Sequence, residues 1–257
     1  MPTLLVVVAH PDDETFGCGS VLLHAAERGR TVVVCLTRGE EGENAGGLAL
    51  GAGGLGEARE AELRAAAALL RVDQVEVLDY RDSGMSGDLP PGSLCAAPLA
   101  ELVDVVADAI SRHQPSVVVA LDGSDGHRDH QRVREAVVAA LPSDLPLYVS
   151  SLPRSLFHEW LRVRGALGDA DTDLPEIGTP DEQLTTVLDT SRHYATRQLA
   201  IAEHRSQASP YEGLPADLHR RFLASDYLVR INPPWSGGDR ESDLVGLDSA
   251  AGRSEPR

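Results

Sequence analysis

Short apolar runs, separated by segments of helix-forming residues, dominate the first 150 residues of the chain. Three runs rich in Val and Leu, at 4–9, 31–36 and 116–121, are almost uninterrupted by polar residues, which is typical of strands buried on both faces of a sheet. The alternation of such strands with helices predicts an α/β fold, an open and mostly parallel Rossmann-like sheet with helices on both faces. We expect strands at 4–9, 31–36, 75–78, 116–121 and 147–150, and helices at 16–28, 57–70, 98–113 and 130–141.

The alternation weakens after residue 150. A length of 257 residues suits one large domain, and we predict a single domain over 1–235, made of the core 1–150 and a smaller C-terminal α+β extension over 151–235. Residues 168–183 contain six carboxylates and no basic residue, which predicts an exposed loop. Residues 236–257 are mostly small or charged and predict a disordered tail. In the extension we expect strands at 184–189 and 227–231 and a helix at 191–205.

The charged residues exclude several classes of function. The chain has 40 acidic and 23 basic residues, a formal net charge of −17, and all of the basic residues are arginine. A Walker-type phosphate loop, Schiff-base catalysis and a Ser–Lys nucleophile each need the ε-amine of lysine, so this chain can have none of them. The acidic surface repels phosphate backbones, so we expect no nucleic-acid partner.

Targeting signals and structural disulfides are not expected. The apolar start at 4–9 is too short for a signal-peptide core or a membrane span, and no basic region precedes it. The three cysteines (Cys18, Cys35 and Cys95) form no CxxC pair, which favours a reducing compartment. We therefore expect a cytoplasmic protein that has no membrane partner, and the sequence leaves open whether it forms a homo-oligomer.

Two clusters of metal-ligand residue types follow the first and fourth predicted strands. The first is Ala9-His-Pro-Asp-Asp-Glu14, and the second is Gly126-His-Arg-Asp-His130. In an open α/β sheet the functional site lies beyond the carboxyl ends of the strands, where both clusters fall. Imidazole and carboxylate together suit Zn²⁺ or another borderline divalent metal, and a catalytic zinc needs about three protein ligands and an open position. The two clusters therefore predict one metal site.

These paired motifs resemble the PIG-L/LmbE-like zinc-dependent de-N-acetylases, which remove an acetyl group from N-acetylglucosamine in a glycoconjugate. The resemblance covers about residues 3–232. The segment Tyr80-Arg-Asp-Ser-Gly-Met85 resembles the branch that acts on mycothiol and its precursor. The resemblance implies a small-molecule amino-sugar glycoconjugate as substrate and Zn²⁺ as cofactor, with Fe²⁺ or another divalent metal as the alternative.

The resemblance also implies a role for each matching residue. The zinc ligands would be His10, Asp13 and His130. Asp12 would be the general base that deprotonates the attacking water. His127 would stabilise the oxyanion or protonate the leaving amine, and Asp129 would orient or charge it. The expected substrate contacts are Arg59, Asp82, Met85 and His204. Independently of the resemblance, Glu14 either supports the metal ligands from behind, which we favour, or begins the following helix.

One position departs from the pattern of the mycothiol branch. That branch has a tyrosine two positions before the first His of the second motif, where this chain has Asp125. An ionised carboxylate cannot donate a hydrogen bond to an oxyanion, so the substrate within the family stays open. An amidase that acts on a mycothiol-type S-conjugate is the nearest alternative. A non-haem Fe(II) oxygenase, suggested by His127-x-Asp129, and a non-catalytic metal- or carbohydrate-binding protein are more distant ones.

Overall fold

The computed structural model describes residues 1–166 and 176–247 as one sheet covered by helices. The seven strands of the described residues lie in the order β3-β2-β1-β4-β5-β7-β6. Strands β1 to β5 are parallel to one another, whereas β7 is antiparallel to both β5 and β6. The strands are β1 (Thr3–Val8), β2 (Arg30–Thr37), β3 (Gln74–Tyr80), β4 (Val117–Leu121), β5 (Leu147–Ser150), β6 (Thr186–Asp189) and β7 (Ser225–Asn232). This arrangement confirms the predicted fold class, and it is not the all-β jelly roll on which the oxygenase alternative depends.

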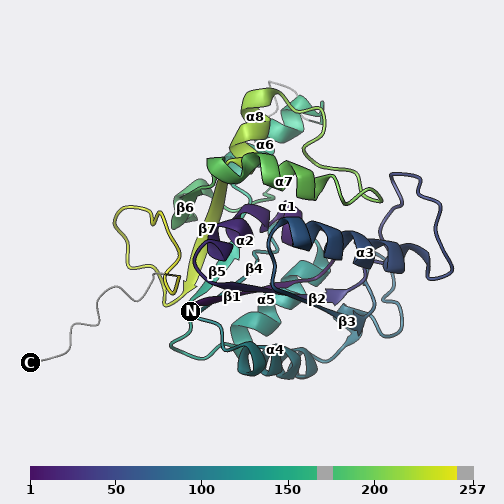
Figure 1. The fold of residues 1–257 in the computed structure, drawn as a ribbon, viewed down its shortest axis with the longest axis horizontal. Helices are drawn as coiled ribbons and strands as arrows, with labels where there is room; N and C mark the ends of the chain where they lie inside the picture. The colour runs from purple at the N-terminus through teal and green to yellow at the C-terminus, as the bar shows by residue number, and fades with distance from the viewer. Residues whose placement is uncertain (167–175, 248–257) are drawn as a thin grey trace, which may run out of the picture.

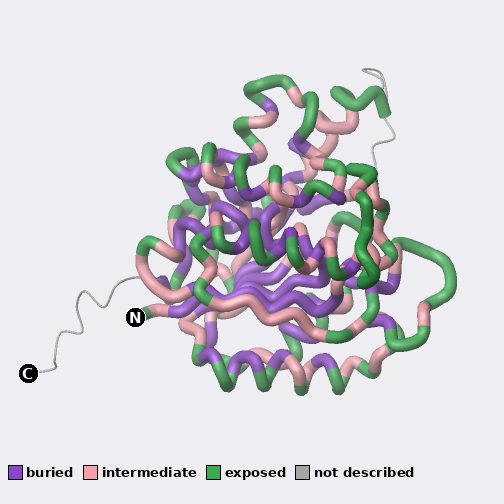
Figure 2. The backbone as a smooth tube through the Cα atoms, turned by 45° about the vertical axis from the view of Figure 1, so that its right-hand side comes forward, coloured by how far each residue is buried: buried purple, intermediate pink, exposed green. Residues whose placement is uncertain are grey.

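Helices cover both faces of the sheet (Figure 1). The side chains of β1 alternate between two cores: Leu4, Val6 and Val8 join the core that includes residues of α2, α3 and α7, and Leu5 and Val7 join the core with α4 and α5. The sheet is therefore buried on both faces, as Figure 2 shows. The helices are α1 (Asp13–Phe16), α2 (Gly19–Ala26), α3 (Gly54–Leu69), α4 (Leu99–His113), α5 (Arg128–Ala140), α6 (Arg154–Val163), α7 (Tyr194–Ile201) and α8 (Ala216–Leu223).

The first predicted helix is divided in two in the structure. It begins at Asp13 and is interrupted at Gly17 and Cys18 before α2 begins. A Cβ atom on Gly17 would lie 2.6 Å from Leu121 Cδ2, at the end of β4. Only glycine allows α1 to approach the end of β4 this closely, and this approach joins the two segments that carry the predicted metal ligands.

The C-terminal part of the chain continues the same sheet, because β7 pairs with β5 and β6 pairs with β7. Helices α6 and α8 were not predicted. Both are short, and each follows a proline that occupies the N-cap position, Pro153 or Pro215. An ion pair between Arg221 Nη1 and Glu159 Oε2, at 2.5 Å, joins the two helices.

The described part of the predicted tail is ordered, contrary to expectation. The backbone of Glu241 forms a parallel β-bridge with Thr186, the first residue of β6. The side chains of Leu244 and Leu247 are 0% and 1% exposed and belong to the core on the α2 and α3 side. These two leucines thus hold the segment against the domain, together with polar contacts such as that of Asp243 with His24. Residues 248–257 of the predicted tail, and 168–175 of the predicted acidic loop, lie outside the described residues. None of the helices in the described ranges is both long and apolar enough to cross a membrane.

Candidate active site

The site lies between β1 and β4, where the chain stops adding strands on one side of β1 and begins to add them on the other. From β1 the chain passes to β2 and β3 on one side, and β4 and β5 pair on the other. The segments after β1 and β4 therefore diverge at the carboxyl edge of the sheet and leave a crevice, the usual ligand site of such folds. His10 to Glu14 follow β1, and Asp122 to His130 follow β4 and lead into α5. The two ligand-rich segments thus meet at the predicted edge of the sheet.

Asp13 bonds to the backbone of the segment that follows β1. Its Oδ2 accepts backbone N–H bonds from Ala9, at 3.2 Å, and from His10, at 2.8 Å. Its Oδ1 lies 3.2 Å from His130 Nε2. The imidazole groups lower the pKa of Asp13 well below its usual range, although burial opposes this.

The structure brings His10, Asp13 and His130 together. The distance between His10 Nδ1 and His130 Nε2 is 3.2 Å, and that between His10 Nδ1 and Asp13 Oδ2 is 3.6 Å. Two ligands that are each 2.0–2.1 Å from a tetrahedral zinc lie about 3.3 Å apart. The three side chains therefore match a borderline divalent metal in donor type, and their pairwise distances lie near this value, with Asp13 facing His10 through Oδ2 and His130 through Oδ1.

His130 is oriented by Asp125. Its Nδ1 lies 2.6 Å from Asp125 Oδ2, so that Nε2 faces His10. Burial lowers the pKa of His130, but Asp13 and Asp125 outweigh this and raise it to about 10. A carboxylate behind a histidine is the usual support of a metal ligand. Sequence reasoning missed this role, although the position of Asp125 in the loop just before α5 was a signal.

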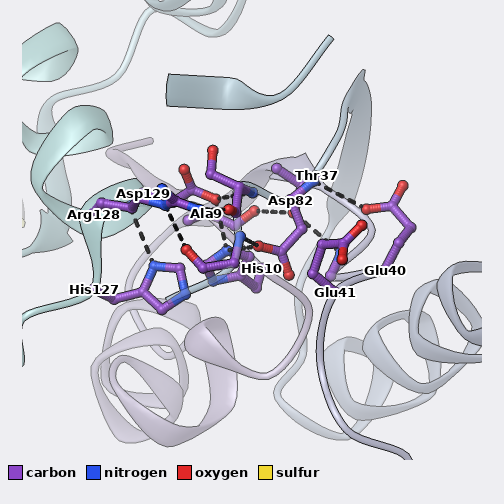
Figure 3. Close-up of polar contacts among 12 residues, drawn as sticks. Ala9, His10, Thr37, Glu40, Glu41, Asp82, His127, Arg128 and Asp129 are labelled. Atoms are coloured by element: carbon purple, nitrogen blue, oxygen red, sulfur yellow. Dashed lines mark hydrogen bonds and ion pairs between the residues drawn. The ribbon is translucent and has the colours of Figure 1, made fainter. Parts of the chain in front are cut away.

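His10 has two acidic neighbours on its other side (Figure 3). Its Nε2 lies 3.2 Å from Asp129 Oδ2 and 3.5 Å from Asp82 Oδ1. These contacts raise the pKa of His10 well above its usual value, despite the opposing effect of burial. Within the described ranges, two other sets of side chains each bring three donor atoms within 4.8 Å of one another, namely His10, His127 and His130, and His10, Asp82 and Asp129, and neither contains Asp13. Both sets share His10, which is therefore the centre of the site.

Asp129 does not hold His127 through its side chain, contrary to the expected role. The carboxylate is 0% exposed; besides facing His10, it accepts the backbone N–H of Ser83 at 2.9 Å and the thiol of Cys95 at 3.1 Å. Only the backbone N–H of Asp129 meets His127, donating to Nδ1 at 3.2 Å (Figure 3). The hydrogen bonds to Asp129 keep its pKa below the usual range, although burial opposes this. Asp129 thus supports His10 rather than His127.

His127 lies over the other histidines. Its ring stacks on His130, with centroids 4.8 Å apart at 29°. Burial, together with the positive charges favoured at His10 and His130, lowers the pKa of His127 to about 4. Because Nδ1 accepts a hydrogen bond, the proton of the neutral ring is on Nε2.

Asp12 has an unusual backbone conformation, with φ at 113°. Its N–H donates to Glu14 Oε2 at 2.9 Å. Its carboxylate pairs with Arg59, with 3.2 Å between Asp12 Oδ2 and Arg59 Nη2. Burial raises the pKa of Asp12 to about 6, against the opposing effect of the Arg59 cation. A non-glycine residue stays in this region of φ only when its surroundings hold it there.

Arg59 is the main support of Asp12. Its side chain is 5% exposed, and the guanidinium also donates to the carbonyl oxygens of Gly39 and Pro11, both at 2.7 Å. The structure thus shows Arg59 anchoring the loop after β1, whereas the sequence suggested a substrate anchor. A direct contact with substrate stays a prediction.

The other expected substrate contacts differ in position. Asp82 and Met85 line the cavity, and Met85 is 63% exposed. His204 does not line it: the side chain is 0% exposed, and its Nε2 lies 2.9 Å from Glu14 Oε1. The expectation that His204 binds substrate is therefore corrected, and Glu14 contacts the backbone of Asp12 and not the side chains of the expected metal ligands.

One cavity of about 580 Å³ contains the site. His10, Asp12, Asp13, His127 and His130 all open into it. Its volume lies in the range of small-molecule sites, about 300–1,000 Å³. The cavity extends to aromatic residues of α6 and α8, which the sequence analysis did not single out.

Comparison with known families identifies the class. The sequence profile of PIG-L, described as GlcNAc-PI de-N-acetylase, matches residues 5–141, more than half of the chain. The chain therefore belongs to the PIG-L family, and the resemblance drawn from its motifs is confirmed.

Relatives with similar sequences carry one name. A protein of Saccharopolyspora erythraea, 1D-myo-inositol 2-acetamido-2-deoxy-alpha-D-glucopyranoside deacetylase 1, is 37% identical over 236 residues, which cover 80% of this chain and 78% of the relative. The 1D-myo-inositol 2-acetamido-2-deoxy-alpha-D-glucopyranoside deacetylase of Mycolicibacterium vanbaalenii is 39% identical over 281 residues, covering 98% of this chain and 93% of the relative.

Solved structures with lower identity share the fold. A deacetylase of the teicoplanin biosynthesis pathway has a TM-score of 0.61 and 21% identity, covering 90% of this chain and 99% of that one. For 4-carboxy-2-hydroxymuconate hydratase of Pseudomonas putida the TM-score is 0.59 at 21% identity, covering 93% and 99%. One of these proteins is named a deacetylase and the other a hydratase, so the reaction must be argued from the site and not from the fold.

Proposed function

We propose that this protein hydrolyses the N-acetyl group of an N-acetylglucosamine-type glycoside with the help of a divalent metal, releasing acetate and a free amino sugar. The observation that carries the proposal is the convergence of His10, Asp13 and His130 within 3.6 Å of one another, with Asp12 beside them in the same cavity. The family and the names of the relatives support an amide of this kind as the substrate.

His10, Asp13 and His130 would hold the metal, which we propose to be Zn²⁺, with Fe²⁺ as the alternative for this donor set. When bound, such a metal polarises the amide carbonyl and lowers the pKa of a coordinated water to about 7. The protein's own contribution is to fix the donors, through Asp125 behind His130 and Asp129 behind His10.

Asp12 would accept the proton of the attacking water. Its carboxylate lines the cavity next to Asp13, and its pKa of about 6 leaves it ionised near neutral pH yet basic enough to take a proton. Arg59 and Glu14 hold the carboxylate and the backbone of Asp12 in place.

His127 would donate a hydrogen bond from Nε2 to the amide oxygen as negative charge develops there. The proton that the leaving nitrogen needs would come from Asp12, which takes it from the attacking water. A neutral imidazole whose Nδ1 is bonded to the backbone has this proton available without titrating near neutral pH. No lysine competes for the role, because the chain has none.

The proposed substrate is a small amino-sugar glycoconjugate, and inositol-linked N-acetylglucosamine is the first to test because relatives are named for it. A cytoplasmic location and a homo-oligomeric assembly stay predictions.

The test measures acetate release from a panel of N-acetylglucosaminides by the purified, metal-analysed protein. Asp12→Asn should lower kcat by about 10²–10⁴-fold and keep the metal content. Asp108→Asn, at an exposed position on α4, is the matched control and should leave kcat unchanged. Full activity in Asp12→Asn overturns the assigned base, and glycoside binding without acetate release identifies a non-catalytic binding protein.

A further inference from the structure

The cavity extends from the candidate site to a second, apolar lining. This lining comes from α6, the loop before it, the segment between α7 and α8, and α8 itself, none of which carries a candidate catalytic residue. We call it the apolar wall; its residues are Leu152, Leu156, Phe157, Trp160, Tyr211 and Phe222. In Figure 1, α6 and α8 lie together on the same side of the sheet as α7.

The polar atoms of the wall are already bonded to the backbone. Trp160 Nε1 donates to the carbonyl oxygen of Pro210 at 2.7 Å, and the hydroxyl of Tyr211 donates to the carbonyl oxygen of Phe16 at 2.8 Å. The other four members have no polar side-chain atom. A polyol placed here would lose hydrogen bonds to water without regaining them, which is costly.

The wall is also held in shape by its own contacts. The rings of Phe157 and Trp160 stack with centroids 5.7 Å apart at 13°, and the Arg164 guanidinium lies 5.3 Å from the indole centroid. Tyr211 packs against Phe222 at 5.5 Å. A surface with few free rotamers costs little entropy when a ligand binds, so the wall is a formed subsite.

We infer that the natural substrate carries an alkyl or aryl group that lies against the apolar wall while its N-acetyl amide is at His10 and His130. The inference rests on the proposed function, which fixes the acyl group as acetyl and leaves the group linked to the sugar to meet the wall. Because the wall and the candidate site share one cavity, a single substrate can reach both. In the relatives' printed names the group linked to the sugar is inositol, a polar polyol. The inferred substrate of this chain therefore carries a different group on the sugar.

The experiment compares methyl, octyl and phenyl N-acetylglucosaminides, and inositol-linked N-acetylglucosamine, by kcat/KM for acetate release from the metal-loaded protein. The octyl and phenyl glycosides should exceed the methyl glycoside by about tenfold or more. Trp160→Ala should reduce this preference by about tenfold, mainly through KM, because it removes the largest apolar surface of the wall. Val163→Ala, at a 43% exposed position on the same helix, is the matched control and should keep the preference.

Equal kcat/KM for the methyl and octyl glycosides overturns the inference, as does a preference for the inositol-linked substrate that Trp160→Ala leaves unchanged. A preference for N-octanoyl over N-acetyl in the methyl glycoside also overturns it, because the wall would then receive the acyl group.

Calorimetry with the deacetylated octyl and methyl glucosaminides tests the wall separately. If no glycoside releases acetate but the octyl amine still binds about tenfold more tightly, the proposed function fails and the wall stands. Equal binding of the two amines overturns the wall. Phe157→Ala provides a second variant if Trp160→Ala does not fold.

Discussion

His204 Nε2 lies 2.9 Å from Glu14 Oε1, and both side chains are fully buried. The second oxygen of Glu14 accepts the backbone N–H of Asp12, whose φ is 113°. A residue in this conformation costs about 1–3 kcal/mol, which its surroundings must offset. The Glu14–His204 pair thus reaches the proposed base through the backbone, without contact with the cavity.

Glu14→Ala should therefore lower kcat by about 10–100-fold while KM changes little, because the loop around Asp12 loses the acceptor that holds it. Glu14→Gln keeps one oxygen for the Asp12 N–H and should recover part of the loss. Steady-state kinetics on one glycoside, with metal content measured for each variant, provides the test. A normal kcat in Glu14→Ala, or a loss fully explained by missing metal, contradicts this positioning role.

Asp125 occupies the position where the sequence resemblance leads us to expect a tyrosine. In the structure it lies behind His130, with 2.6 Å between Oδ2 and Nδ1. Asp125→Ala should weaken metal binding by about 10–100-fold, because the ring loses the carboxylate that orients it. Competition with a chelator measures the affinity, and Asp144→Ala, an exposed acid before β5, should bind metal as the wild type does. Unchanged affinity in Asp125→Ala would show that His130 is oriented without this carboxylate.

The sequence was sufficient to predict the parallel strands β1 to β5 and the meeting of the two ligand-rich segments, because buried strands have a recognisable composition and their carboxyl ends meet at one edge. It did not predict that β6 and β7 continue the same sheet. It could not predict the direction of single side chains. Asp129 lies two residues from His127 in the sequence, yet its carboxylate meets His10, which follows a different strand.

Arg59 and His204 were misinterpreted for a related reason. Each is a polar residue in a family-like motif, and only the tertiary structure shows its protein partners: loop carbonyl oxygens for Arg59, which also lines the cavity, and the buried Glu14 for His204. The apolar wall was missed because its residues are spread over separate segments, each of which has only an ordinary amphipathic pattern.

Glu76 links β3 to the end of α4 and makes stability depend on pH. Its Oε1 lies 2.7 Å from Arg112 Nη1 and 2.8 Å from His113 Nε2, and the bonds from Arg112 lower its pKa below the usual value. A carboxyl group with a lowered pKa in the folded state contributes stability above its unfolded pKa, about 4.3, and loses it as the pH falls through the folded value.

Glu76→Gln should therefore lower the free energy of unfolding by about 1 kcal/mol at pH 7, and the difference from wild type should shrink below pH 4. Urea unfolding at several pH values measures both effects. Glu135→Gln, on an exposed part of α5, is the matched control. A difference that is constant with pH would mean that the carboxylate charge does not stabilise the fold.

Leu244 tests the ordered C-terminal segment, because it is 0% exposed although it lies in a stretch of polar composition. Replacing a buried leucine by alanine removes apolar contacts and leaves a cavity, so Leu244→Ala should cost about 2–5 kcal/mol of unfolding free energy. Its neighbour Val245 is 38% exposed, and Val245→Ala should cost much less. Urea unfolding of both variants against wild type gives the two differences directly. Because the segment packs on the α2 and α3 side of the sheet, Leu244→Ala should leave the metal affinity of the folded protein unchanged. Similar, small losses in the two variants would mean that residues 241–247 do not contribute to the stability of the domain.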